Sequence, residues 1–237
     1  EDLKLKEEYE NRINRTINKV PFNSLLIGIP LIERDDKVDI ESDQLEKYVE
    51  IVAELIFHPR IDVVCLPVFN RLNENMIKSI IERFLEIITS YNKYVALTIP
   101  YVSRNLMVSI IYEYFKASNT NDKLLHNLVC VDYNGSNALT KYAFHNFILS
   151  FKARLEKELG EDVLLYGVNV KYAKASKKKA EIPARDILSY YAELDSFGSN
   201  HKKILMPQQV IDKLKKENKL SSRILNRNRY TYIPLHD

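Results

Sequence analysis

Two aspartates stand beside apolar segments of the sequence, where a carboxylate could do chemistry. Asp132 ends the apolar run in VCVDYNG, and Asp195 lies in AELDSFG. A carboxylate at the end of a buried strand is partly desolvated, which raises its pKa and suits it to transfer a proton. We therefore expect Asp132 and Asp195 to be catalytic acid/base residues. The alternative for each is that it initiates a turn or caps a helix.

Polar and cationic side chains follow the same segments and could bind a substrate. Amides form hydrogen bonds with ligands, and arginine, lysine or histidine can hold a phosphate or carboxylate group. The alternative is that Arg104 pairs with surface carboxylates and that His201 is a solvated loop residue. The residues expected to bind substrate are Arg104, Asn134, Asn169, Lys171, Asn200 and His201.

The C-terminal third is basic, although the whole chain of 237 residues has a net charge of only +3. Such a region favours an anionic partner, and arginines interspersed with tyrosines, as in SSRILNRNRYTY, are usable for binding RNA. A solvated, solubilising surface would have the same composition. The residues expected to contact nucleic acid are Lys177, Lys178, Lys179, Arg223, Arg227 and Arg229.

Apolar segments that alternate with amphipathic helices must position these side chains. Strands that are apolar on both faces and separated by helices predict an α/β fold with a parallel sheet. A partial TIM-like barrel is the preferred architecture, and an open doubly wound sheet is the alternative. We expect a surface helix in residues 1–22, one barrel-like domain in 23–220 and a basic tail in 221–237. The expected strands are 23–32, 61–69, 94–102, 127–133, 163–173 and a sixth within 195–205.

Several common kinds of site are absent from the sequence. The five glycines form neither a dinucleotide-binding GxGxxG motif nor a phosphate-binding P-loop. Cys65 and Cys130 lie in separate apolar runs, which predicts buried thiols, a reducing compartment and no zinc site. We therefore expect neither cofactor nor metal. The charged N-terminus and the lack of an apolar run of about 20 residues favour a cytoplasmic protein without a membrane partner.

One segment resembles a known family. LLYGVNVKYA, followed by PARDILSYYAELDSFGSNHK, is similar to the late barrel units of tRNA-guanine transglycosylases over residues 164–201. The resemblance implies a barrel. It implies no activity, because Gly198 stands where that family has its nucleophilic aspartate, and because the family's Cys/His zinc ligands are missing.

Two functions follow from these expectations. The first is a barrel-type enzyme that acts by carboxylate acid/base chemistry on a phosphorylated or other anionic substrate, with nucleic-acid-related molecules among the candidates. The alternative is a non-catalytic scaffold of degenerate barrel fold that binds RNA or serves in an assembly. Either protein could form oligomers.

Overall fold

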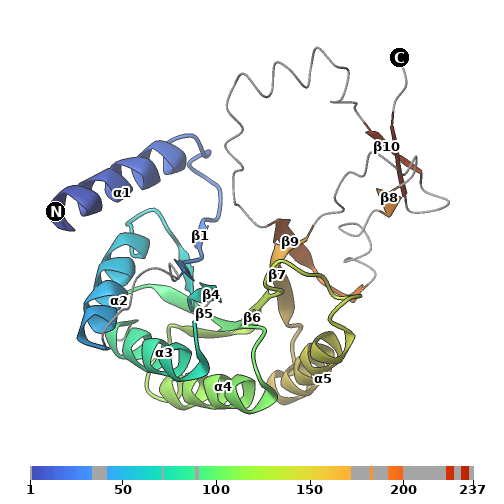
Figure 1. Cartoon of the computed structure of the whole chain (residues 1–237). Helices are drawn as coiled ribbons and strands as arrows, with labels where there is room; N and C mark the ends of the chain where they lie inside the picture. Colours follow the sequence, from blue (N-terminus) through green and yellow to red (C-terminus); the bar gives the residue numbers. More distant parts are fainter. Residues whose placement is uncertain are drawn as a thin grey trace.

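A parallel sheet forms the centre of the chain and curls into a half-barrel (Figure 1). The strand order β1-β3-β5-β6-β7-β9 rises steadily along the sequence, and every neighbouring pair is parallel. A doubly wound sheet would reverse its order at a switch point, so the winding is that of a barrel. A closed TIM barrel is not formed by the strands that the computed structural model describes. These strands are β1 (Ile27–Gly28), β3 (Val63–Cys65), β5 (Tyr94–Ile99), β6 (Leu124–Asp132), β7 (Leu164–Val170) and β9 (Ser196–Ser199).

The structure describes eight stretches of the chain. They are residues 2–33, 42–70, 72–88, 91–171, 182–183, 192–199, 223–226 and 231–234.

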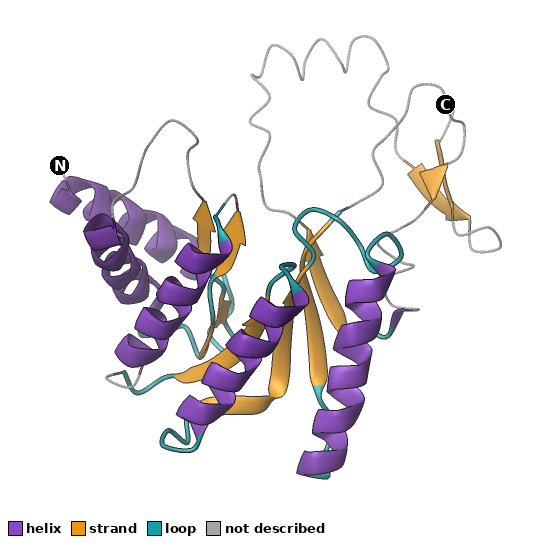
Figure 2. Cartoon of the chain, turned by 60° about the horizontal axis from the view of Figure 1, so that its bottom comes forward, coloured by secondary structure: helices purple, strands orange, loops and turns teal. Residues whose placement is uncertain are grey.

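Helices cover the outer, convex face of the sheet (Figure 2). Ser103 caps α4, because its hydroxyl accepts a hydrogen bond from the Leu106 amide. Gly160 ends α5 in the left-handed conformation, with φ of 72°. In the parts of the chain that the structure describes, no helix has the length and apolar character needed to cross a membrane. The helices are α1 (Asp2–Ile17), α2 (Ser42–Ile56), α3 (Glu74–Ile88), α4 (Arg104–Ser118) and α5 (Tyr142–Leu159).

Prolines split the first two expected strands. Pro30 separates β1 from β2 (Leu31–Glu33), and Pro67 separates β3 from β4 (Val68–Asn70). Because proline has no N–H to donate, it cannot continue a ladder on both sides. β2 and β4 therefore form their own parallel pair at the carboxyl end of the sheet. The expectation of two uninterrupted strands, 23–32 and 61–69, was wrong for this reason.

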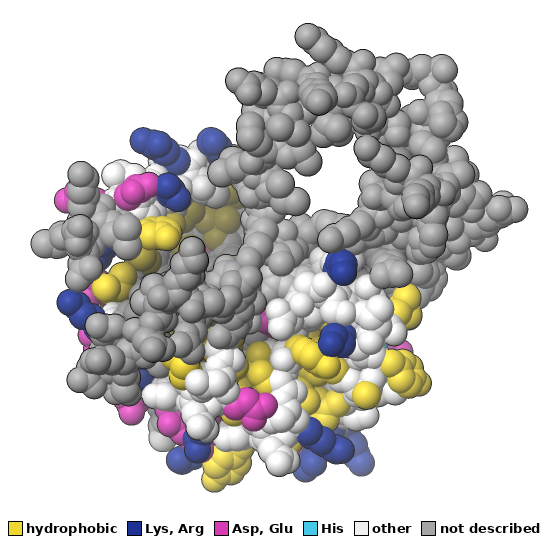
Figure 3. Space-filling model, viewed as in Figure 1, with side chains coloured by type: hydrophobic (Ala, Val, Ile, Leu, Met, Phe, Trp, Pro, Cys, Tyr) yellow, Lys and Arg dark blue, Asp and Glu magenta, His cyan; other side chains and the backbone are white. Residues whose placement is uncertain are grey.

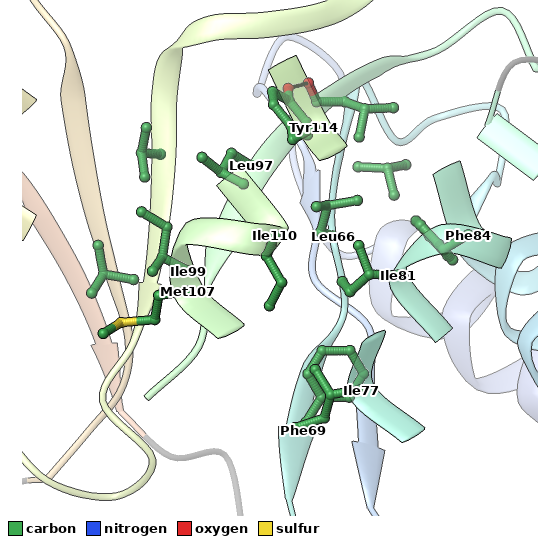
Figure 4. Packing of buried hydrophobic residues seen from close by; sticks show 14 of the residues in the cluster. Leu66, Phe69, Ile77, Ile81, Phe84, Leu97, Ile99, Met107, Ile110 and Tyr114 are labelled. Carbon is green, nitrogen blue, oxygen red and sulfur yellow. Dashed lines mark hydrogen bonds between the residues drawn. The ribbon is translucent and has the colours of Figure 1, made fainter. Parts of the chain in front are cut away.

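The main core lies between the sheet and its helices (Figure 4). Leu66, Leu97 and Ile99 of the strand region pack against Phe84 of α3 and Ile110 of α4, and all of them are almost fully buried. The hydroxyl of Tyr114 lies 2.7 Å from the Val95 carbonyl oxygen and 2.8 Å from that of Leu125. This polar contact ties α4 to two neighbouring strands.

A second, smaller cluster occupies the inner face and shows how strongly the sheet curves. The sulfurs of Cys65 on β3 and Cys130 on β6 are 3.1 Å apart, although β5 lies between these strands. In a flat sheet, strands two places apart are separated by about 10 Å. The small side chain of Ala96 on β5 leaves room for the sulfurs to meet above it. Both cysteines are buried free thiols, as expected.

Three short strands lie outside the half-barrel. β10 (Arg223–Asn226) pairs antiparallel with β11 (Thr231–Pro234), and β11 pairs with β8 (Ile182–Pro183). The sequence predicts a helix that opens at Pro183 and a tail without periodicity. The structure places Ile182–Pro183 in a strand that shares a sheet with two stretches of the tail, and residues 184–191 of the expected helix lie outside the described residues.

Candidate functional site

Asp132 is fully buried at the carboxyl end of β6. It lies two residues beyond Cys130, so strand alternation places both on the inner face, whereas Val131 packs in the outer core. Its Oδ1 accepts hydrogen bonds from the Asn134 amide (2.9 Å) and from Asn169 Nδ2 (2.8 Å). Its Oδ2 is buried and has no hydrogen-bond partner. Oδ1 therefore holds the local structure through two hydrogen bonds, whereas Oδ2 makes no hydrogen bond.

A tight turn after β6 fixes this arrangement. Asn134 and Gly135 have φ of 47° and 69°, and the Ser136 amide donates to the Tyr133 carbonyl at 2.9 Å. These are the features of a type I′ turn, for which Asn-Gly is a preferred sequence. The Gly135 amide donates to the Asn169 carbonyl at 2.9 Å, so the turn is held against the end of β7. The side chain of Asn134 is exposed, and its contribution is its backbone amide.

Asn169 links Asp132 to a pocket on the concave side of the sheet. Its φ of 52° is left-handed, a conformation that asparagine tolerates better than most residues. The side chain donates to Asp132 and also forms part of the pocket wall. The pocket has a volume of about 170 Å³ and is lined by Ile29, Leu31, Val68, Tyr166, Val168, Asn169 and Gly198.

The pocket occupies the place where barrel enzymes bind their ligands. Its wall residues come from β2, β4, β7 and β9 and from the segment between β1 and β2, and the β2–β4 pair follows the carboxyl ends of β1 and β3. In parallel α/β folds, ligands bind outside the carboxyl ends of the strands. The wall is mainly apolar with a few polar groups, which is the usual character of a small-molecule site.

The inner face alters the acidity of the groups that it buries. Burial raises the pKa of Asp132, and the hydrogen bonds from Asn169 and the Asn134 amide partly oppose this shift. The pKa of Cys130 is raised well above its ordinary value by its hydrogen bond with Cys65 and by burial. Cys130 therefore stays a thiol and is not suited to be a nucleophile. The raised pKa makes Asp132 the candidate acid/base group among the described residues of this face.

Asp195 lies at the amino ends of the strands, whereas Asp132 lies at their carboxyl ends. It precedes β9, its Oδ2 accepts a hydrogen bond from the Leu165 amide (2.8 Å), and that oxygen is 3.4 Å from Lys152 Nζ. Leu165 is near the start of β7, so these contacts are at the amino ends of the strands. The structure does not bring the two aspartates together. The sequence predicts Asp195 at a strand exit, and this prediction was wrong because the short strand SFGS begins after it.

The other predicted substrate-binding residues are distributed over different parts of the molecule. Asn169 lines the pocket, Asn134 lies in the turn after β6 with an exposed side chain, and Lys171 follows β7 with an exposed side chain. Arg104 begins α4, and its guanidinium lies 5.8 Å from the Phe147 ring, in a groove on the outer face. Asn200 and His201 lie outside the described residues.

The predicted nucleic-acid contacts fall mostly outside the described residues. This holds for Lys177, Lys178, Lys179, Arg227 and Arg229. The backbone of Arg223 is described and begins β10.

Two groups of residues near the site were not anticipated from the sequence. Tyr166 and Val168 line the pocket, and their spacing of two along a strand is the signal that could have identified them. On the outer side, Tyr133 and His145 are buried together, with 2.7 Å between the Tyr133 oxygen and His145 Nδ1. Burial raises the pKa of Tyr133 and lowers that of His145, which favours the neutral form of both side chains. Tyr133 directly follows Asp132, so this contact ties the end of β6 to α5.

Comparison with family models, with curated proteins and with solved structures found no match to this chain.

Proposed function

We propose that this chain is a half-barrel enzyme in which Asp132 transfers a proton to or from a small molecule bound in the concave pocket. The molecule carries an anionic group, for which Lys171 at the same edge of the sheet is the candidate partner. Asn169 contacts both the carboxylate and the pocket and therefore orients Asp132 toward the substrate. Arg104 and Asp195 have no part in this proposal because they lie elsewhere.

The observation that carries the proposal is the unpartnered Oδ2 of Asp132. A buried carboxylate oxygen without a hydrogen bond is costly, and native proteins pair the great majority of such atoms. Exceptions beside a pocket are candidates for chemistry, because the same desolvation that costs stability raises the pKa toward the range useful for proton transfer. A purely structural aspartate in this turn would need only its Oδ1.

The pocket limits the size of the substrate's reacting part. A volume of about 170 Å³ fits a few heavy atoms, so a larger anionic molecule would place only its reacting end inside. The apolar walls lower the local dielectric, which strengthens the interaction of Asp132 with that end. Asp132 is fully buried and does not itself line the pocket, so the proposal requires the substrate to displace part of the pocket wall and reach Oδ2.

The test compares three forms of the protein. Phosphorylated and carboxylated metabolites are screened for an increase in melting temperature, and turnover is then measured for those that bind. Asp132→Asn keeps the shape and removes the proton-transferring group, so turnover should fall by a factor of about 100 or more. Asp195→Asn should keep turnover within about threefold. Equal activity of Asp132→Asn and the native protein would refute the proposal, and a loss confined to Asp195→Asn would move the site to the other edge.

The alternative function expected from the sequence is an RNA-binding scaffold. It depends on lysines and arginines that lie mainly outside the described residues. Its test is a titration of labelled RNA at several salt concentrations, in which binding should weaken steeply as salt is added. Absence of binding at low salt would rule it out.

A further inference from the structure

A groove with apolar walls runs between α4 and α5 on the outer face of the half-barrel. Its main hollow has a volume of about 400 Å³. A second hollow continues it toward the start of both helices and shares the wall residues Arg104, Phe147 and Ser150. Figure 3 shows hydrophobic side chains reaching the surface in the region of these two helices. The apolar walls consist of Val108, Ile111, Phe115, Phe147, Phe151 and Leu155.

A ridge of α4 beside this groove carries large apolar side chains that face solvent. Tyr112 is 63% exposed, and Val108, one turn before it, is 51% exposed. The buried residues of α4 include Met107, Ile110 and Tyr114, so helical geometry places Tyr112 on the side away from the core. Contiguous apolar surface of this kind commonly marks an interaction site.

The exposed surface of α5 beside the groove carries small side chains. Ser150 and Ala153 are exposed and lie about one turn apart on the face of α5 that looks away from the core. Small residues let another helix approach closely. A molecule that carries both a protruding tyrosine ridge and a groove beside small side chains is complementary to a copy of itself under two-fold rotation.

The charges at the two ends of the groove fit the same symmetry. Arg104 stands at one end and has no carboxylate partner among the described residues. Glu158 stands at the other end, where its partner is Arg154 on its own helix, 3.0 Å away and exposed. Rotation about an axis perpendicular to the groove brings Arg104 of one copy to Glu158 of the other. Two equivalent ion pairs would then form, one at each end.

We propose that a second copy of this chain occupies the α4–α5 groove and forms a two-fold symmetric dimer in which the α4 helices run antiparallel. Tyr112 of each copy packs into the groove of the other, over Ser150 and Ala153. This interface uses the convex face of the sheet, and the pocket beside Asp132 opens on the concave side. Dimer formation is therefore independent of the proposed catalytic function.

The first test measures molar mass by light scattering after size-exclusion chromatography, over a range of protein concentrations. The native chain should run as a dimer. Tyr112→Glu should shift it to the monomer, because a buried carboxylate in an apolar groove is costly. The matched control is Tyr9→Glu on α1, which also replaces a half-exposed tyrosine (48%) and should leave the dimer intact. Circular dichroism should be unchanged in both variants.

The second test exchanges the charges. Arg104→Glu and Glu158→Arg should each raise the dimer dissociation constant by at least threefold, and the double variant should recover most of that loss. A native protein that is monomeric at all concentrations would overturn the proposal and leave the groove to a different protein. A dimer that survives both Tyr112→Glu and Arg104→Glu would place the interface on another surface and would overturn it equally.

Discussion

The proposed function depends on a single carboxylate of the concave face. Asp132 has one oxygen held by two donors and one without a partner, so its geometry is fixed while a binding atom stays free. The Asn-Gly turn after β6 helps to fix this geometry. The turn supplies the Asn134 amide to Oδ1 and also brings Gly135 against the carbonyl of Asn169.

The raised pKa of Asp132 has a consequence for stability that can be measured. A carboxyl group with a higher pKa in the folded than in the unfolded state binds more protons when folded. Folding stability then falls as pH rises from about the ordinary value of 3.8 to the folded-state pKa. Asp132→Asn lacks this loss, so its stability relative to the native protein should improve between pH 3.5 and pH 7. Urea denaturation at several pH values measures the difference, and a relative stability that worsens with pH would mean that the pKa is lowered.

At the scale of elements, the contact between β1 and α2 depends on the absence of a side chain. A Cβ atom on Gly28 would come within 2.8 Å of Ile56 Cδ1 and 3.1 Å of Ile61 Cγ2. Gly28→Ala should therefore lower the free energy of unfolding, by about 1–3 kcal/mol if α2 cannot shift. Combining it with Ile56→Val, which removes the nearest methyl group, should recover part of the loss in a denaturation experiment. If Gly28→Ala is neutral on its own, the end of the Ile56 side chain yields without cost.

The sequence predicted the elements better than it predicted their ends. Apolar runs such as LVCVDY identified strands, and their alternation with amphipathic helices correctly indicated a parallel sheet. Pro30 and Pro67 were visible, but their effect depends on whether both neighbours of a strand need its N–H groups, which is a tertiary property. Asp195 was assigned to the wrong end of a strand because SFGS has little apolar content to show where it begins. The pairing of Asp132 with Asn169 joins residues 37 positions apart and has no local signal.

At the scale of the whole molecule, curvature separates two faces with different roles. The convex face carries the helices and most of the buried side chains, whereas the concave face carries a small cluster of Val63, Cys65, Ala96 and Cys130. The pocket adjoins this cluster, since Ile29 and Tyr166 belong to the pocket wall and also pack against the cluster. The shape of the candidate site is therefore set by how tightly the sheet curls.

The size of residue 96 should control that curl. Ala96→Leu adds three carbons where the sulfurs of Cys65 and Cys130 meet, and overpacking of a buried site typically costs about 1–3 kcal/mol of unfolding free energy. The variant should also bind pocket ligands more weakly, because a flatter sheet moves β7 away from β4. The same substitution should cost less in a Cys65→Ala background, because removing the Cys65 sulfur leaves room for the leucine side chain. A double-mutant cycle in urea measures this coupling. If the cost is the same in both backgrounds, the leucine and the sulfur do not compete for one volume, and the curvature must have another cause.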